Sequence, residues 1–482
     1  MLFTSPVFLF FFLPVVVAAY FAFPRRLRSV RNTWLLAASF FFYWWGEPRF
    51  TAVLAASCLV NWAAGLLSAP GRRFRHVFFF LAVAANLALL FVYKYAGFAA
   101  AQCNGLIGTS WRIPAIALPL GISFFTFQAM SYVIDVHAGK SRPRANPLDV
   151  ALYVVLFPQL VAGPIVRYGT VEAEIRSRRE NWRDFSAGLC RFAEGFAKKM
   201  LLANPLGVVA DSAFDGADWI LPAVGGGGVF LAWLGAVAFA FQIYFDFSGY
   251  SDMAIGIGRV FGFHFEENFL HPYVSRSVSE FWRRWHVSMG TWFRDYVYFP
   301  LGGSRVRTPA RLLANLFAVW LLTGLWHGAN WTFVLWGLFH FVLIAAEKLA
   351  GTAKRVRGPL LSALGWGGTM LFVLFGWVLF RADSLSGAFR YFGTMFGGHG
   401  ARFANPAAFL LFRENAPLLA VSALLCFPFA PALARRVDAF CVSRGAKAVR
   451  SAFRAAWLVF LFLASLSFVA KGAHNPFLYF NF

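Results

Sequence analysis

Residues 311–349 read RLLANLFAVWLLTGLWHGANWTFVLWGLFHFVLIAAEKL. The charged side chains Arg311, Glu347 and Lys348 stand near the two ends of this stretch, and no Lys, Arg, Asp or Glu lies between Arg311 and Glu347. A helix needs about 20 mostly apolar residues to cross the hydrocarbon core of a bilayer. The runs 311–327 and 330–349 each come close to that length. The stretch therefore predicts two membrane-spanning helices joined by a very short connection.

The composition of the whole chain has the same character. The chain has 482 residues, of which 59% are hydrophobic, and its mean hydropathy is +0.61. Charged residues make up 13%, whereas soluble domains have roughly 25%. A soluble globule of this size cannot bury so much apolar surface, because its own exterior must be wetted. The composition indicates a polytopic membrane protein and excludes soluble, disordered and collagen-like chains.

Apolar runs separated by polar loops give the expected architecture. We predict an all-α polytopic membrane protein, a single integral-membrane domain over residues 1–482, with about 11–13 transmembrane helices. The candidate spans are 2–23, 32–46, 51–68, 77–97, 116–135, 196–215, 223–247, 311–327, 330–349, 363–381, 416–434 and 455–471. The stretch 151–166 is also apolar, but Pro158, Gly163 and Pro164 interrupt it. Because basic sequence flanks it on both sides, we predict a re-entrant segment there.

The net charge of +23 admits two interpretations. On a soluble chain it would suggest nucleic-acid binding. Here most of the 44 Lys and Arg residues are divided among seven loops, namely 25–31, 69–76, 136–150, 167–199, 248–311, 347–358 and 435–454. Such loops of membrane proteins lie on the cytoplasmic side. We therefore predict a multi-pass protein in a lipid bilayer with both termini on the outer side, and no nucleic-acid partner.

No pattern in the sequence predicts a bound metal or cofactor. The five cysteines form no CxxC pair, and neither an HExxH motif nor a dinucleotide-binding fingerprint occurs. His264 and His271 are seven residues apart, which is too far for the paired ligands that one helix face presents. We expect no bound cofactor and no metal ligands.

The longest polar interval, 248–311, alternates aromatic and basic residues. Its centre reads Phe281-Trp-Arg-Arg-Trp-His286. One interpretation is simple anchoring at the membrane interface, where aromatic rings and Arg side chains are common. The other is a lid over an anionic cytoplasmic ligand, such as the phosphates of a thioester carrier, because Arg forms bidentate contacts with phosphate. Under the second interpretation Trp282, Arg283 and Arg284 are candidate substrate-binding residues.

Two ionisable residues fall within apolar stretches. His327 ends the run that begins at 312, and Asp246 lies in Gln242-Ile-Tyr-Phe-Asp-Phe-Ser248. Ionisable residues inside membrane segments are rare and often functional, although a histidine can also serve as a hydrogen-bonded contact between helices. A neutral imidazole at membrane depth can act as general base toward an alcohol. Asp246 either accepts structural hydrogen bonds or orients a catalytic or bound group.

These motifs together resemble the membrane-bound O-acyltransferase (MBOAT) family. Within that family, the chain is most similar to the bacterial branch that includes the alginate O-acetylation and teichoic-acid D-alanylation membrane proteins. The resemblance extends over essentially the whole chain. The segments that carry it are Met1–Phe10, Phe40–Trp45, Pro119–Phe127, Phe157–Ile165, Phe281–His286, Trp292–Tyr296, Pro300–Gly303, Leu325–Trp331 and Pro476–Phe482.

The resemblance implies catalytic roles for two histidines. His327 matches the family's intramembrane catalytic histidine, and His286 matches its second polar position. We expect His327 to act as general base and His286 to assist it, with Asp246, Trp282, Arg283, Arg284, Trp326 and Asn330 contacting substrate. The resemblance implies an acyl-thioester co-substrate, either acetyl-CoA or acyl carrier protein. It also implies a bacterial inner-membrane location, periplasmic termini and periplasmic polysaccharide-acetylation partners.

The expected reaction is O-acetylation of an exopolysaccharide, with alginate as the first choice. Two alternatives remain open at this stage. The first is a sister acyltransferase for another cargo or polymer, such as D-alanine on teichoic acid, or acetate on cellulose or peptidoglycan. The second is a transporter or channel component without chemistry. A His327 variant distinguishes the second alternative from the two enzymatic ones, because a non-catalytic component would still support polymer modification when His327 is replaced.

Overall fold

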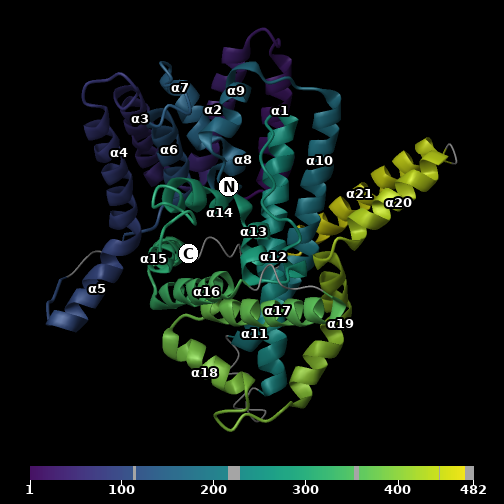
Figure 1. Ribbon diagram of the computed structural model, residues 1–482. Coiled ribbons are helices and arrows are strands. Elements are labelled where there is room, and N and C mark those ends of the chain that lie inside the picture. The colour runs from purple at the N-terminus through teal and green to yellow at the C-terminus, as the bar shows by residue number, and fades with distance from the viewer. Residues whose placement is uncertain (112–115, 215–227, 352–357, 444–445, 473–482) are drawn as a thin grey trace. The chain divides into compact units, whose positions relative to one another are not determined.

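The protein is described from a computed structural model that covers residues 1–111, 116–214, 228–351, 358–443 and 446–472. All regular elements within these ranges are helices, and no strand occurs there (Figure 1). The predicted all-α class is therefore confirmed. The described residues form two compact units. The prediction that the chain acts as a single domain stays a prediction.

The first unit comprises Met1–Phe192 and Tyr250–Glu267. Its helices are η1 (Phe8–Phe12), α1 (Leu13–Ala22), α2 (Arg28–Gly46), η2 (Pro48–Phe50), α3 (Thr51–Leu67), α4 (Arg75–Leu90), η3 (Phe91–Tyr95), α5 (Ala96–Ile107), α6 (Ile122–His137), α7 (Pro147–Val155), α8 (Phe157–Leu160), α9 (Tyr168–Ser177), most of α10 (Trp182–Ala197) and the end of α12 (Val229–Val260).

A buried ionic cluster centred on Glu180 joins several elements of the first unit. Its carboxylate accepts hydrogen bonds from Arg28 and Tyr20 and forms an ion pair with Arg31 at 3.2 Å. Burial acts to raise the pKa of Glu180, but the hydrogen bonds from Arg28 and Tyr20 outweigh it and hold the pKa at about 2. The cluster joins α1 and α2 to the segment that precedes α10 with a carboxylate that stays ionised.

The segment predicted as re-entrant is broken where its prolines and glycine suggested. Helix α7 ends at Val155, Leu156 is extended, and the short helix α8 carries Pro158. Residues 151–166 are buried throughout in the first unit. Irregular backbone at membrane depth is tolerated when protein surrounds it. The break is confirmed, and the return of the chain to the same membrane face stays a prediction.

The second unit comprises Ala193–Gly249 and Asn268–Phe482. Besides the end of α10 and most of α12, its helices are η4 (Lys198–Ala203), α11 (Asn204–Phe214), η5 (Pro272–Val274), α13 (Val278–Arg284), α14 (Val287–Phe293), η6 (Arg294–Tyr298), α15 (Pro309–His327), α16 (Trp331–Ala350), α17 (Pro359–Arg381), α18 (Leu385–Met395), α19 (Pro406–Cys426), α20 (Phe429–Ser443) and α21 (Lys447–Ala470).

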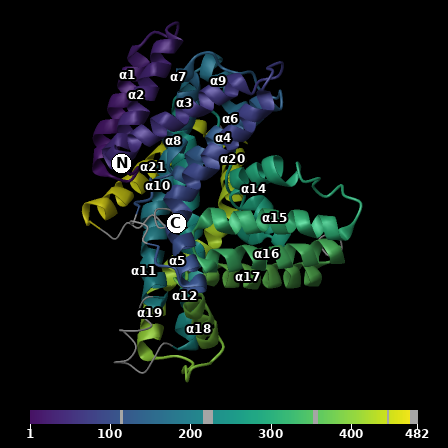
Figure 2. The ribbon, with the colours of Figure 1, turned by 90° about the vertical axis from the view of Figure 1, so that its left-hand side faces the viewer.

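Helices α15, α16 and α17 run side by side in the second unit (Figure 2). Two glycines bring the first two of them into backbone contact. A Cβ atom on Gly337 would lie 2.4 Å from the carbonyl oxygen of Trp320, and one on Gly324 would lie 2.5 Å from that of Phe333. Small residues allow such close approach between membrane helices. The pair of helices predicted from residues 311–349 is confirmed. The close packing of α15 against α16 holds the C-terminal end of α15 in place.

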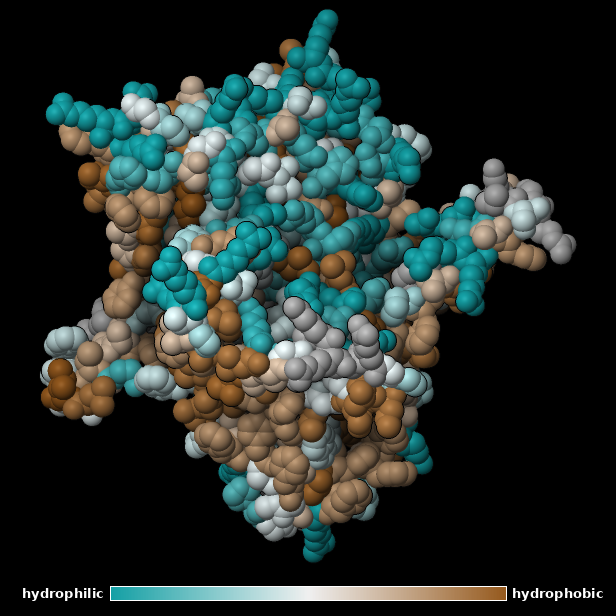
Figure 3. All heavy atoms as spheres, in the orientation of Figure 1, coloured by the Kyte–Doolittle hydropathy of each residue, from teal (hydrophilic) through white to brown (hydrophobic). Residues whose placement is uncertain are grey.

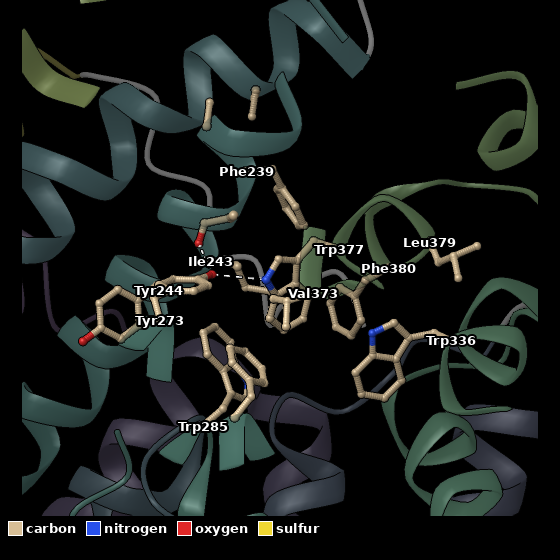
Figure 4. Close-up of a cluster of buried hydrophobic side chains, with 14 of the residues drawn as sticks. Phe239, Ile243, Tyr244, Tyr273, Trp285, Trp336, Val373, Trp377, Leu379 and Phe380 are labelled. Atoms are coloured by element: carbon tan, nitrogen blue, oxygen red, sulfur yellow. Dashed lines mark hydrogen bonds between the residues drawn. The ribbon is translucent and has the colours of Figure 1, made fainter. Parts of the chain in front are cut away.

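A core of large aromatic side chains fills the second unit beside these helices (Figure 4). Tyr273 stands at its centre, where its hydroxyl donates to the carbonyl oxygen of Ala240 at 2.6 Å and accepts the indole N–H of Trp377 at 3.1 Å. Buried Tyr and Trp side chains usually find such partners. The core therefore combines apolar packing with hydrogen bonds that fix the orientation of its rings.

Eight helices of the described residues are long and apolar enough to cross a membrane. They are Pro48–Leu67, Arg75–Ile107, Val229–Val260, Pro309–His327, Trp331–Ala350, Pro359–Arg381, Pro406–Cys426 and Ala448–Ala470. Several other predicted spans are shorter apolar helices, such as Phe8–Ala22 and Ile122–His137. Exposed hydrophobic side chains gather over α4 and α5 (Figure 3), including Phe80, Leu106 and Ile107. Such a surface suits contact with lipid chains.

The boundaries of two predicted spans differ from the helices. The predicted span 416–434 is replaced by α19, which begins at Pro406 and continues through Pro417. The predicted span 223–247 begins outside the described residues, and α12 runs on to Val260. The start of the polar interval 248–311 is thus helical, because in the first unit Asp252 pairs with Arg191 at 2.8 Å instead of facing water. The closing segment Pro476–Phe482 lies outside the described residues.

Candidate active site

His327 is the last residue of α15, and its side chain is only 5% exposed. Gly328 follows it in an extended conformation and ends the helix. A Cβ atom on Gly328 would lie 2.3 Å from the ring of Phe333, so only glycine fits at that point. Gly328 thus allows both a break in the helix and a close approach of the ring of Phe333. His327 is therefore held at a helix end inside the protein.

Aromatic rings surround His327 on several sides. Its ring centroid lies 4.9 Å from that of Trp326, 5.0 Å from that of Trp336 and 5.0 Å from that of Phe380. All three pairs are close to edge-to-face, with interplanar angles of 75–81°. Such walls exclude water and restrict the rotation of the imidazole. They suit a base that must stay poised in an apolar setting.

His286 lies at the start of α14 in the left-handed backbone region, with φ 45°. A non-glycine residue in that region stores about 1–3 kcal/mol of strain, and such residues gather at functional sites. Its side chain is fully buried, and burial lowers the pKa of His286 to about 3. The imidazole is therefore neutral at physiological pH.

The side chain of Asn268 orients the His286 ring. Its Oδ1 lies 3.1 Å from Nδ1 of His286 and also accepts the backbone N–H and the hydroxyl of Ser288, at 3.2 and 2.9 Å. Because Oδ1 accepts a backbone N–H, it is the amide oxygen, and Nδ1 of His286 must donate to it. Nε2 is therefore the basic nitrogen of His286.

The structure brings the two predicted catalytic histidines to one region of the second unit. Trp326 connects them, since its ring lies 6.0 Å from that of His286 and 4.9 Å from that of His327. Phe247 closes another side of His286 at 4.6 Å. The predicted residue Trp326 thus touches both imidazoles. Two buried imidazoles that contact the same indole ring can handle a proton without exposure to bulk water.

Asp246 is buried in α12, immediately before Phe247. Its Oδ1 lies 2.6 Å from Nζ of Lys199 in the π-helical element η4. Both side chains are almost entirely buried, and such a pair is strongly destabilised when one partner is lost. The contact supports the structural alternative for Asp246, and its substrate contact stays a prediction.

The three predicted residues of α13 differ in their surroundings. Trp282 packs edge-to-face against Trp320 at 5.1 Å and Trp336 at 5.3 Å. Arg284 is held by Glu280 at 2.9 Å and by the carbonyl oxygen of Leu270 at 3.0 Å. Arg283 is exposed. Of the two arginines, Arg283 is thus the exposed one, and its contact with a substrate stays a prediction.

Asn330 caps α16, the helix that follows His327. Its side-chain oxygen accepts the backbone N–H of Thr332 at 3.1 Å, and its Nδ2 donates to the carbonyl oxygen of Asp383 at 2.8 Å. Asn is a favoured residue at this helix position because it satisfies an otherwise unpaired N–H group. The geometry gives Asn330 a structural role in fixing the turn after His327, and its contact with substrate stays a prediction.

Several residues near the site were missed from the sequence. Asn268, Ser288 and Lys199 sit in loops or helix ends far along the chain from their partners, and no local pattern marks them. The sequence does mark His340, because it lies four residues after Trp336 in an apolar run, and this spacing places the two side chains on one face of a helix. Its Nδ1 is 2.9 Å from the carbonyl oxygen of Trp336, and its ring packs 4.8 Å from the indole.

Metal ligation has no geometric support within the ranges that the structure covers. No group of three or more His, Cys, Asp or Glu side chains there is arranged to hold an ion.

Comparison with known proteins agrees with this geometry. The model of the MBOAT, membrane-bound O-acyltransferase, family matches residues 140–386, which include both histidines. The probable alginate O-acetylase AlgI of Pseudomonas putida is 39% identical over the full length of both chains. The chain belongs to the membrane-bound O-acyltransferase family.

Two further relatives show the range of acceptors within this family. The probable alginate O-acetylase AlgI of Pseudomonas aeruginosa is 42% identical over 82% of this chain and 75% of its own length. The peptidoglycan O-acetyltransferase of Helicobacter pylori is 31% identical over 100% of this chain and 98% of its own. This MBOAT chain is an O-acyltransferase and a multi-pass membrane protein. Membership favours the enzymatic interpretation over a transporter without chemistry.

Proposed function

We propose that this membrane-bound O-acyltransferase uses an acetyl thioester from the cytoplasm to O-acetylate an exopolysaccharide, with alginate as the acceptor polymer. The observation that carries the proposal is the burial of His327 and His286 in contact with the same residue, Trp326, in a member of this family. Relatives named as alginate O-acetylases, at 37–42% identity, support the acetyl group and the polymer. The co-substrate is acetyl-CoA or acyl carrier protein.

In the proposed mechanism, His327 takes the proton of the acceptor hydroxyl as its oxygen attacks the thioester carbonyl. The carbon–sulfur bond then breaks, the thiolate takes the proton from the imidazolium, and an acetyl ester and a thiol remain. His286, with Nδ1 fixed by Asn268, presents Nε2 as an acceptor that orients a polar group of the reactants. The exposed Arg283 attracts the phosphates of the incoming donor.

The matched test compares wild type with His327→Ala in cells that export alginate. We expect the variant to reach the membrane at normal level while the acetyl content of the polymer falls to background. A variant that retains normal acetyl content would contradict the assignment of His327. Purified protein with labelled acetyl-CoA or acetyl-loaded acyl carrier protein identifies the donor, because only the true donor is consumed in a His327-dependent manner.

Peptidoglycan is the second candidate acceptor. The observation that favours it is the full-length match to the Helicobacter pylori enzyme. The same cells provide the comparison, since acetyl groups can be measured on muropeptides and on exported polysaccharide from one culture. If the His327 variant loses only the acetyl groups on muropeptides, the acceptor is peptidoglycan and not alginate.

The charge distribution supports one orientation of the protein in the membrane. We propose that the protein lies in the bacterial inner membrane with both termini in the periplasm and works with periplasmic acetylation proteins. The excess of Lys and Arg in seven loops supports this orientation. Fusions of alkaline phosphatase to each terminus should be active, and fusions to the loop 167–199 should be inactive. The opposite pattern would reverse the orientation.

A further inference from the structure

Trp336 is the sixth residue of α16, and its side chain is fully buried in the second unit. Among the residues that the structure describes, its indole Nε1–H has no hydrogen-bond acceptor. A buried indole usually has one, because an unsatisfied donor carries a desolvation penalty. Trp377, which is also buried, follows this rule and donates to the hydroxyl of Tyr273 at 3.1 Å. Trp336 thus keeps an indole N–H without an acceptor among the described residues, in the same core where Trp377 uses its own N–H structurally.

The position of this donor relates it to His327. The two rings are 5.0 Å apart and nearly perpendicular, and Phe380 packs against both, at 5.0 Å from His327 and 5.5 Å from Trp336. Figure 4 shows the indole nitrogen on the side of Phe380. A Cβ atom on Gly376, one turn before Phe380, would lie 3.7 Å from Nε1. The N–H therefore faces the surface of α17 that also lines His327.

We propose that the Nε1–H of Trp336 donates a hydrogen bond to the oxyanion that forms when the thioester is attacked beside His327. This inference rests on the proposed function. As the hydroxyl oxygen bonds to the carbonyl carbon, the carbonyl π pair moves onto oxygen, and His327 receives the hydroxyl proton. The negative oxygen then accepts the indole N–H until the pair re-forms the C=O bond and expels the thiolate, which takes the proton from His327.

The setting favours a donor of this kind. A dipole that is fixed before the reaction and aimed at developing charge stabilises the transition state most in a water-excluded site. The indole cannot turn freely, since Trp282, His340 and Phe380 pack against it. Trp282 also has a buried Nε1 without an acceptor in the described ranges, but Trp336 and not Trp282 contacts the His327 ring.

The test distinguishes the contribution of the Trp336 N–H from the contribution of its aromatic ring. In Trp336→Phe most of the aromatic contact remains and the donor is lost, and replacement of Trp336 by β-(3-benzothienyl)alanine keeps the ring size while sulfur takes the place of N–H. We expect both variants to lower kcat about 100-fold, as removal of one oxyanion donor does. We expect the KM for acetyl-CoA to change less than about threefold, because the hydrogen bond strengthens only as charge develops.

Trp377→Phe is the matched control. It removes an indole N–H that donates to Tyr273 in the same core, so it should lower the melting temperature and leave kcat within about threefold of wild type. A benzothienyl variant at position 336 with wild-type kcat would overturn the inference while leaving the proposed function intact. If wild-type protein shows no acetyl transfer that depends on His327, the proposed function fails instead.

Discussion

Nδ1 of His286 lies 3.1 Å from Oδ1 of Asn268, and this contact decides which imidazole nitrogen is basic. The two residues are 18 positions apart in the chain. The backbone N–H of Ser288 donates to the same oxygen and so fixes the orientation of the amide. One asparagine therefore sets both the tautomer and the angle of a buried histidine whose own backbone is strained.

Loss of the Asn268 amide should impair turnover more than binding. In Asn268→Ala the His286 ring can rotate, and a misplaced catalytic group costs up to about 100-fold in rate. We expect kcat for acetyl transfer to fall about 10–100-fold, with the KM for donor within about threefold. Ser288→Ala serves as control, because it removes the hydroxyl contact at 2.9 Å but leaves the imidazole contact intact. Equal loss in both variants would contradict the orienting role.

The buried His286 should make the protein sensitive to acid. Burial lowers its folded-state pKa to about 3, whereas its ordinary value is 6.5. Between these values the unfolded chain binds a proton that the folded protein does not, so stability is full above pH 6.5 and is lost as the pH falls. The loss is about 1.4 kcal/mol per pH unit below that point. Melting temperatures in detergent from pH 7 to 5 should fall less steeply for His286→Gln than for wild type.

The Lys199–Asp246 pair gives a test of whether Asp246 acts on substrate. Either Lys199→Met or Asp246→Leu alone leaves a buried charge, so each should destabilise the protein by about 3–5 kcal/mol. The double variant replaces both charges by apolar side chains and should recover most of that stability. If the double variant also recovers acetyl transfer, Asp246 is structural. Recovered melting temperature without activity would assign Asp246 a role in the reaction.

The membrane class and the local structure around His327 were predictable because each depends on residues close together in the chain. The two runs around His327 show their length and hydropathy directly, and Gly324 and Gly328 mark close packing. The roles of Asn268 and Lys199 were not predictable, because each depends on a partner brought near by tertiary packing. Asn330 stands beside His327 in the motif, yet its amide caps α16, and adjacency in sequence cannot distinguish those two roles.

The length of α12 shows why span boundaries were harder to predict. A polar loop was predicted from residue 248 onward, and the carboxylate of Asp252 lies in that interval. In the first unit Arg191 lies 2.8 Å from that carboxylate, and the helix continues to Val260. A charge in the sequence predicts a helix end only when no countercharge reaches it, and the sequence does not show the countercharge.

The glycine contact between α15 and α16 should be sensitive to a single methyl group. A Cβ atom on Gly337 would lie 2.4 Å from the carbonyl oxygen of Trp320, and backbone atoms cannot easily yield. Gly337→Ala should therefore lower stability by about 1–3 kcal/mol, as overpacking does. Gly367→Ala in α17 is the control, since no atom lies within 4 Å of its Cβ position. A thermal melt that ranks the two variants in the reverse order would contradict the tight contact.

Arg283 and Arg284 are neighbours in α13 with different surroundings, which makes them a matched pair for donor binding. The guanidinium of Arg284 already donates hydrogen bonds to Glu280 and to the carbonyl oxygen of Leu270, whereas Arg283 is exposed. Loss of one charge-assisted phosphate contact weakens binding by about tenfold. Arg283→Ala should therefore raise the KM for acetyl-CoA about 5–10-fold with little change in kcat, and added salt should reduce the difference from wild type. Arg284→Ala should lower the melting temperature instead. An unchanged KM in Arg283→Ala, measured at low ionic strength, would leave membrane anchoring as the role of this aromatic and basic segment.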